Sequence, residues 1–150
     1  MSNRQLLLVA LLLTIISCAQ QKDAQYYFNE GAKLFEKAEF DKAIEFYQQG
    51  IKLEPKSAVG CNLLGMAYRF KFNQTGNVEW RQKEIESFKK AIEINSDFMP
   101  ALVNLGATYY YSGEKKKAVS YFRHVLEVMP NHPEAEELKK MIAEGEEEVK

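Results

Sequence analysis

The chain has 150 residues, of which 46% are hydrophobic and 27% charged, as in ordinary soluble globular proteins. Its formal net charge of −1 argues against a nucleic-acid partner, because nucleic acid requires a clustered basic surface. The two cysteines, Cys18 and Cys61, lie in different kinds of segment, so we do not expect a disulfide framework. The length favours a single domain.

An apolar run near the N-terminus has the features of an export signal. Arg4 precedes the apolar residues 6–16, a run too short to cross a bilayer as a helix, which takes about 20 residues. A positive start, an apolar stretch and then small residues are typical of a secretory signal peptide. The segment therefore predicts export from the cytoplasm.

The end of this run is more specific. Ile15-Ile16-Ser17-Cys18 resembles the bacterial lipobox, although Ile15 stands where leucine is usual. The resemblance implies that the peptide is cut before Cys18, that its thiol receives a diacylglycerol, and that the new amine is acylated, with palmitate as an expected chain. Two or more acyl chains anchor a protein stably to a membrane.

The processed chain would then be a lipoprotein with a short tether. In this interpretation residues 1–17 are the signal peptide and residues 18–23 link the lipid to the fold. Ala19 is not the aspartate that resembles an inner-membrane retention signal, which favours the periplasmic face of the outer membrane. Two alternatives stay open: cleavage after Ala19, which would release a soluble protein, and an uncleaved anchor.

A repeat extends through the rest of the chain. Two series of residues are spaced by 34 and then 41 positions, and two others by 41 and then 34. The four series are Gly31, Gly65 and Gly106; Leu34, Tyr68 and Tyr109; Tyr47, Phe88 and Phe122; and Pro55, Ser96 and Pro130. One insertion of seven residues between Tyr68 and Phe88 brings all four series to a period of 34.

This period and these residues resemble the tetratricopeptide repeat, a helix-turn-helix unit of 34 residues. The match is closest in the third unit, where it comprises Leu105, Gly106, Tyr109, Ala118, Phe122 and Pro130. The resemblance implies an all-α, right-handed α-solenoid of three helix pairs, over 24–57, 58–98 and 99–132. A capping helix and an acidic tail would follow over 133–150, because the last pair of a solenoid otherwise exposes its apolar face.

The pattern also predicts how the helices meet and where they begin. Small residues allow the two helices of a pair to approach closely, and we expect Gly106 and Ala118 to face each other. Ser57 and Asn131 are expected to cap the helices that follow them. The apolar stripe of the capping segment comprises Ala135, Leu138, Met141 and Ile142. We interpret the acidic run over 144–148 as a solvated, fraying tail.

The second unit departs most from the pattern. Its insertion, within residues 69–83, predicts that both helices are about one turn longer, with a turn at 74–77 and Asn77 as the cap of the returning helix. Glu84 stands where the pattern has a small alanine. Trp80 either packs onto the lengthened pair or forms an exposed anchor for a partner.

The sequence contains no recognisable catalytic or metal-binding constellation. The two histidines, His124 and His132, lack the spacing of a zinc hydrolase, and there is neither a nucleophile elbow nor a phosphate loop. We interpret Cys61 as a small buried hydrophobic residue. We therefore expect neither an enzyme nor a bound cofactor or metal; the rival class, an enzyme of cell-wall or peptide metabolism, would need such a constellation.

The resemblance implies a concave groove lined by the first helix of each pair. Candidates for contact with a protein or peptide partner are Asn29, Asn62, Met66, Arg69, Asn104 and Tyr110. Amides can bond the main chain of an extended peptide and aromatic rings can hold its side chains. The alternative is an ordinary helix surface without a ligand.

Some members of the family clamp a peptide's terminal carboxylate with lysines and asparagines in the groove. Here Phe28, Ala32 and Leu63 occupy such places, so we do not expect that activity. The prediction is a membrane-tethered scaffold that binds a protein or peptide. The alternative is an accessory or assembly factor of an envelope or secretion complex. The sequence gives no indication of oligomeric state.

Overall fold

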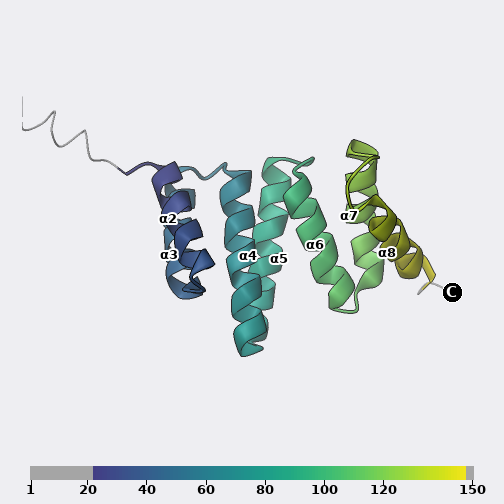
Figure 1. Ribbon diagram of the computed structural model, residues 1–150, viewed down its shortest axis with the longest axis horizontal. Helices are drawn as coiled ribbons and strands as arrows, with labels where there is room; N and C mark the ends of the chain where they lie inside the picture. Colours follow the sequence, from purple (N-terminus) through teal and green to yellow (C-terminus); the bar gives the residue numbers. More distant parts are fainter. Residues whose placement is uncertain (1–21, 148–150) are drawn as a thin grey trace, which may run out of the picture.

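A computed structural model describes residues 22–147, which form helices and connecting turns with no strand in that range. The helices are α2 (Ala24–Glu36), α3 (Phe40–Leu53), α4 (Ala58–Thr75), α5 (Val78–Ile94), α6 (Met99–Tyr111), α7 (Lys115–Val128) and α8 (Ala135–Glu147). They stand in a row as three pairs, and α8 packs across the last one (Figure 1). This confirms the predicted all-α array of three pairs with a capping helix.

Side-chain caps fix the starts of several helices. The Ser57 hydroxyl accepts a hydrogen bond from the Gly60 N–H at 3.2 Å, as predicted, and Asp23 caps α2 in the same way. Such caps satisfy backbone N–H groups that have no partner within the first turn. The expectation for Asn131 was wrong, because α8 begins only at Ala135.

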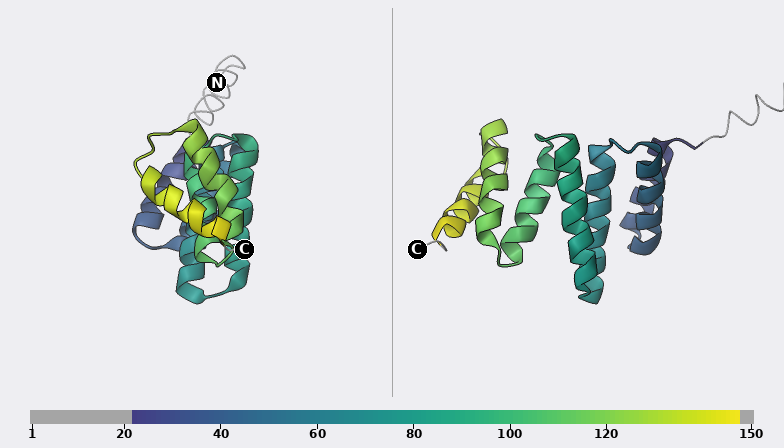
Figure 2. Two further views of the ribbon diagram at one scale, coloured as in Figure 1. Left: turned by 90° about the vertical axis from the view of Figure 1, so that its right-hand side faces the viewer. Right: turned by 180° about the vertical axis from the view of Figure 1, so that it is seen from behind.

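The insertion lengthens the second pair as predicted. Helix α4 has 18 residues against 13 in α2 and α6, and α5 has 17 against 14 in α3 and α7. Gly76 ends α4 in the left-handed conformation, at a φ of 67°, and the Asn77 side chain caps α5 through the Glu79 N–H. The two lengthened helices project beyond their neighbours at one edge of the row (Figures 1 and 2).

Within each pair, an aromatic ring of the second helix fits against a glycine of the first. A Cβ added at Gly106 would lie 2.4 Å from a carbon of the Phe122 ring. The equivalent contacts join Gly31 to Tyr47 and Gly65 to Phe88. The side chain nearest to Gly106 is therefore Phe122, whose flat ring fills the space that the missing Cβ leaves open. The expected approach of Gly106 and Ala118 stays a prediction.

Helix α8 closes the array with both apolar and charged contacts. Leu138 and Met141 are buried in the same core cluster as Phe122. The interpretation of the acidic run as a fraying tail was wrong for its helical part. Glu144 accepts hydrogen bonds from the Tyr110 hydroxyl at 2.5 Å and from the Lys115 ammonium at 2.8 Å.

These contacts shift the pKa values of Glu144 and Tyr110. The hydrogen bond from Lys115, followed by that from Tyr110, holds the pKa of the Glu144 carboxyl below its usual value. The bond to Glu144 is also the main reason that the pKa of Tyr110 is raised. Glu146, two residues further along α8, pairs with Arg123 of α7. The tail carboxylates therefore help to hold α8 in place.

Trp80 packs onto its own helix pair, the first of the two predicted alternatives. Its indole ring stacks on the Tyr68 ring with the centroids 5.7 Å apart. The Lys83 ammonium lies 4.5 Å from the indole centroid, within the range of a cation–π contact. The tryptophan therefore joins the projecting part of α4 and α5.

Candidate functional site

The first helices of the three pairs contact one another along one face of the array. The Phe35 ring of α2 meets the Phe70 ring of α4 edge-on, with the centroids 5.0 Å apart. Helices α4 and α6 are joined by a hydrogen bond from Asn104 Nδ2 to Asn62 Oδ1 at 3.1 Å. We call the face formed by α2, α4 and α6 the groove face.

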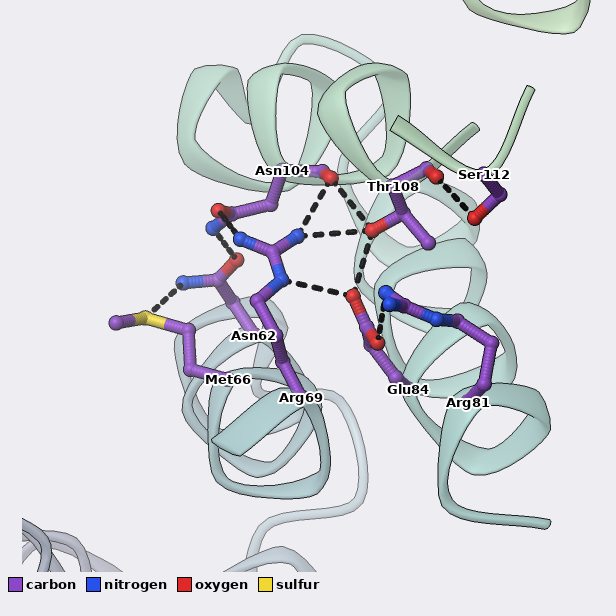
Figure 3. A network of polar contacts seen from close by, with 8 residues as sticks. All are labelled: Asn62, Met66, Arg69, Arg81, Glu84, Asn104, Thr108 and Ser112. Atoms are coloured by element: carbon purple, nitrogen blue, oxygen red, sulfur yellow. Dashed lines mark hydrogen bonds and ion pairs between the residues drawn. The ribbon is translucent and has the colours of Figure 1, made fainter. Parts of the chain in front are cut away.

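Arg69 is the centre of a polar network between α4, α5 and α6 (Figure 3). Its Nε donates to Glu84 Oε1 at 2.8 Å, and its Nη1 donates to Asn104 Oδ1 at 2.9 Å. Its Nη2 donates to the Asn104 carbonyl oxygen at 2.7 Å and to the Thr108 hydroxyl at 2.8 Å. One guanidinium thereby links the second repeat to the third.

Glu84 explains why the second repeat departs from alanine at this position. Its side chain is 0% exposed, so its charge requires partners. Its Oε1 accepts from Arg69 and from the Thr108 hydroxyl, the latter at 2.6 Å, and its Oε2 accepts from Arg81 Nη1 at 2.7 Å. No buried side-chain N or O within residues 22–147 lacks a hydrogen bond.

The structure brings four of the predicted groove residues together, but they bind one another. Asn62, Arg69 and Asn104 form a continuous chain of hydrogen bonds, and Asn62 Nδ2 also lies 3.8 Å from the Met66 sulfur. Their polar groups are therefore largely occupied within the protein. Asn62 is only 7% exposed.

The two remaining candidates lie apart from this network. Tyr110 donates its hydroxyl hydrogen to Glu144 and so joins α6 to the capping helix. Asn29 lies on the exposed surface of α2, where its Oδ1 accepts from Gln25 Nε2 at 2.8 Å. Of the six candidates, only the Asn29 residue is exposed to solvent, whereas the other five are buried or half-buried.

Two exposed aromatic side chains on α4 and α6 complete this face. Phe70 is 41% exposed and Tyr111 is 74% exposed, although both are large aromatic residues. Both lie on first helices of the pairs, but residue type and helical position alone gave no means of separating exposed rings from core rings. Tyr111 borders a pocket of about 320 Å³, which is described below.

Phe28 of α2 has a packing role in the core. It is 4% exposed, and its ring occupies the space beside both Gly50 of α3 and Gly60 of α4. A charged residue here would lose this packing and be desolvated without a partner. The structure thus gives a packing reason for the apolar residue at this place.

Cys61 is buried, as the sequence predicts, and burial is the main cause that raises the pKa of its thiol. A thiol with a raised pKa is a poor nucleophile, because the thiolate is the reactive form. No group of three or more His, Cys, Asp or Glu residues suited to a metal ion occurs between Lys22 and Glu147.

Comparisons with known proteins agree with this architecture. The tetratricopeptide repeat family matches the chain at residues 24–57 and 100–132, which flank the pair that carries the insertion. The chain therefore carries tetratricopeptide repeats, and its fold is that of a tetratricopeptide repeat domain.

Two curated relatives and two solved structures illustrate the range of this likeness. The chain is 23% identical to the photosystem I assembly protein Ycf3 of Rippkaea orientalis over 81% of its own length and 77% of that protein. It is 31% identical to the small glutamine-rich tetratricopeptide repeat-containing protein 2 of Mycosarcoma maydis, over 80% of its length, but spans only 31% of that protein.

Among solved structures, the first repeat domain of Spaghetti (RPAP3) bound to the HSP90 peptide SRMEEVD superposes with a TM-score of 0.68 at 25% identity. The superposition covers 79% of this chain and 92% of that one. YrrB, described as having an unusual peptide-binding site, superposes with a TM-score of 0.66 at 20% identity, over 81% of this chain and 59% of that one.

Proposed function

We propose that this chain is a membrane-tethered scaffold that binds a protein or peptide partner on its groove face. The observation that carries the proposal is the presence of exposed amide and aromatic side chains on three first helices held side by side: Asn29 on α2, Phe70 on α4 and Tyr111 on α6. Exposed aromatic rings are frequent anchors in protein interfaces. The peptide bound to the similar Spaghetti domain supports the same mode of use.

The network around Arg69 has a supporting role in this proposal. It fixes the spacing of α4 and α6 and therefore the distance between Phe70 and Tyr111. Because Asn62 and Asn104 are bonded to each other, replacing them would disturb this spacing as well as any contact with a partner. The sharper test therefore changes exposed groove residues and leaves the network intact.

We expect the double variant Phe70→Ala with Tyr111→Ala to capture at least tenfold less partner from detergent-solubilised membranes. Two truncated aromatic anchors remove apolar area that a partner would bury. The measurement is quantitative mass spectrometry of proteins co-purified with the full chain, with circular dichroism as a check on helical content.

The matched control truncates two exposed apolar residues on second helices, Leu53→Ala with Val128→Ala. These residues are 50% and 45% exposed, so the control also removes exposed apolar surface. The control should retain the partner. If the control loses the partner and the groove variant retains it, the binding surface is formed by the second helices and the proposal is wrong.

The membrane tether is the second part of the proposal. The signal segment 1–17 and Cys18, the expected lipidation site, lie outside the described residues. Within residues 22–147, none of the helices has the length and apolar character needed to span a bilayer. The support for a lipid anchor is the Ile15-Ile16-Ser17-Cys18 motif, and Ala19, which is not the retention aspartate, favours the periplasmic face of the outer membrane.

We expect Cys18→Ser to prevent acylation and to move the protein out of the membrane fraction, because a chain without acyl groups lacks the apolar anchor. Metabolic labelling with a fatty acid, followed by membrane fractionation, measures both effects. Retention of the variant in membranes after a high-salt wash would contradict a lipid anchor, as would an unlabelled wild-type protein.

A second candidate function is an accessory role in assembling an envelope or secretion complex. The observation that favours it is the similarity to Ycf3, a photosystem I assembly protein, over most of both chains. The same capture experiment separates the two. A scaffold should retain its partner at steady state, whereas an assembly factor should retain incompletely assembled subunits of one complex.

A further inference from the structure

The insertion builds a pocket at the edge of the groove face. The pocket has a volume of about 320 Å³ and lies between the ends of α4 and α6 and the start of α5. Its lining residues are Arg69, Asn73, Arg81, Ala107, Thr108 and Tyr111. Asn73 and Arg81 belong to the segment lengthened by the insertion, so a repeat of the standard period would lack this wall.

The two arginines of the pocket are used differently. Arg69 directs three of its nitrogens at Glu84, Asn104 and Thr108, so its donors are nearly all occupied. Arg81 has five N–H donors. Only its Nη1 has a hydrogen-bond partner among residues 22–147, namely Glu84 at 2.7 Å. Most of the hydrogen-bonding capacity of Arg81 is therefore available to a ligand.

The Arg81 guanidinium is also held in a defined position. The Glu84 carboxylate fixes one edge, and the Phe72 ring lies 4.0 Å from the central carbon of the guanidinium. Such stacking orients the plane and reduces the entropy lost when the group binds a ligand. The Arg81 side chain is 24% exposed, so it is supported by the protein and still reachable from solvent.

The charges around the pocket favour an anion. Two guanidinium groups face one buried carboxylate, which leaves one positive charge in excess among Arg69, Arg81 and Glu84. A carboxylate matches the planar donor edge of an arginine and can bind it through two parallel hydrogen bonds. Opposite, Ala107 is small, and the exposed ring of Tyr111 can cover the apolar part of a bound side chain.

We propose that this pocket binds a carboxylate of the partner, with Arg81 as the recognition residue. The inference rests on the proposed function, since it names the chemistry that a partner on the groove face presents beside the insertion. Two sources supply such a group: an Asp or Glu side chain within the partner, or its C-terminal carboxylate. The site is separate from the groove positions of Phe28, Ala32 and Leu63.

The test uses the full chain in detergent micelles and two arrays of random ten-residue peptides. One array is attached through the peptide N-terminus and presents free C-terminal carboxylates, and the other is attached through the C-terminus. We expect binders to carry an acidic side chain at a fixed position on both arrays, or to occur only on the array with free C-termini. These two results identify the source of the carboxylate.

A selected acidic peptide is then compared with a matched neutral peptide, in which Gln or Asn replaces the acid or the C-terminus is amidated. Binding of each peptide to the protein is titrated by fluorescence anisotropy. Arg81→Gln should lower the affinity for the acidic peptide at least tenfold and leave the affinity for the neutral peptide unchanged. Arg81→Lys, which keeps the charge without the planar donor edge, should give an intermediate affinity. Arg123→Gln is the matched control and should have no effect, because this arginine pairs with Glu146 and lies on α7, which does not line the pocket.

The outcomes separate this inference from the function on which it rests. If the selected peptides show no preference for acidic groups, the carboxylate pocket is wrong and the groove proposal stands. The same holds if a folded Arg81→Gln protein loses affinity for both peptides equally. An absence of binders on both arrays contradicts the groove proposal and the inference together. Circular dichroism of Arg81→Gln establishes that the protein is folded; Glu84 keeps Arg69 and Thr108 as partners in that variant.

Discussion

Replacing Glu84 with alanine should lower the free energy of unfolding by about 2–4 kcal/mol, although alanine is the usual residue of the repeat at this position. The change leaves the guanidinium groups of Arg69 and Arg81 without their carboxylate. Removing one partner of a buried ion pair is costly because the remaining charge stays desolvated. The arginine side chains are 23% and 24% exposed, so water offsets part of the loss and the full effect of a buried pair is not expected.

The measurement is urea unfolding followed by circular dichroism, with Glu86→Ala as the control on the same helix. Glu86 is exposed and, within the described part of the chain, accepts a hydrogen bond only from Gln82, so its removal should change stability by no more than about 0.5 kcal/mol. A second variant, Arg69→Met with Glu84→Ala, removes both charges of the central pair and should recover part of the loss. Equal stabilities of Glu84→Ala and Glu86→Ala would mean that the network contributes nothing to the fold.

Gly106→Leu should destabilise the protein by about 1–3 kcal/mol or more and lower its melting temperature by several degrees. Leucine has the higher helix propensity, so the local preference alone would raise stability by up to about 1 kcal/mol. The clash decides the sign, because even a Cβ at this position would lie 2.4 Å from the Phe122 ring. That ring is 1% exposed and has little room to move.

Thermal melts compare this variant with Lys116→Leu, an exposed position on α7. The control introduces the same side chain into the partner helix without meeting a buried neighbour. If the two variants melt at the same temperature, the register that places Gly106 against Phe122 is wrong. The same contact in the other pairs predicts that Gly31→Leu and Gly65→Leu behave in the same way.

The repeat made the helix pairs predictable because its period depends on local packing. Each glycine and its aromatic partner lie within one pair, so a spacing of residues along the chain is enough to place them. The cap at Asn77 was predictable for a similar reason, since it bonds only two residues ahead. Features that depend on residues close in sequence could therefore be predicted.

The polar network between the second and third repeats could not be predicted in the same way. Glu84 was recognised as a departure, but two of its three partners, Arg69 and Thr108, are 15 and 24 residues away on two other helices. A buried carboxylate needs a cationic partner, and this requirement alone could have indicated Arg69. The groove candidates were selected by residue type and helix face, which does not reveal that Asn62, Arg69 and Asn104 occupy one another.

The acidic end of the chain was misjudged for a related reason. A run of carboxylates considered alone is typical of a solvated tail. The register of α8 places Glu144 beside Tyr110 and Lys115, and Glu146 beside Arg123, which only the docked helix reveals. Charge composition thus described the segment correctly but not the surface against which it packs.

Helix α8 also determines what the array cannot do. A helix pair with an open apolar side can accept another pair, either from a longer chain or from a second molecule. Here Leu138 and Met141 fill that side, and the outward surface of α8 is formed by charged residues such as Lys139, Lys140 and Glu147. A second array approaching this end meets hydrated charge instead of apolar surface. Head-to-tail polymerisation through the C-terminal end is therefore disfavoured by the same helix that completes the core.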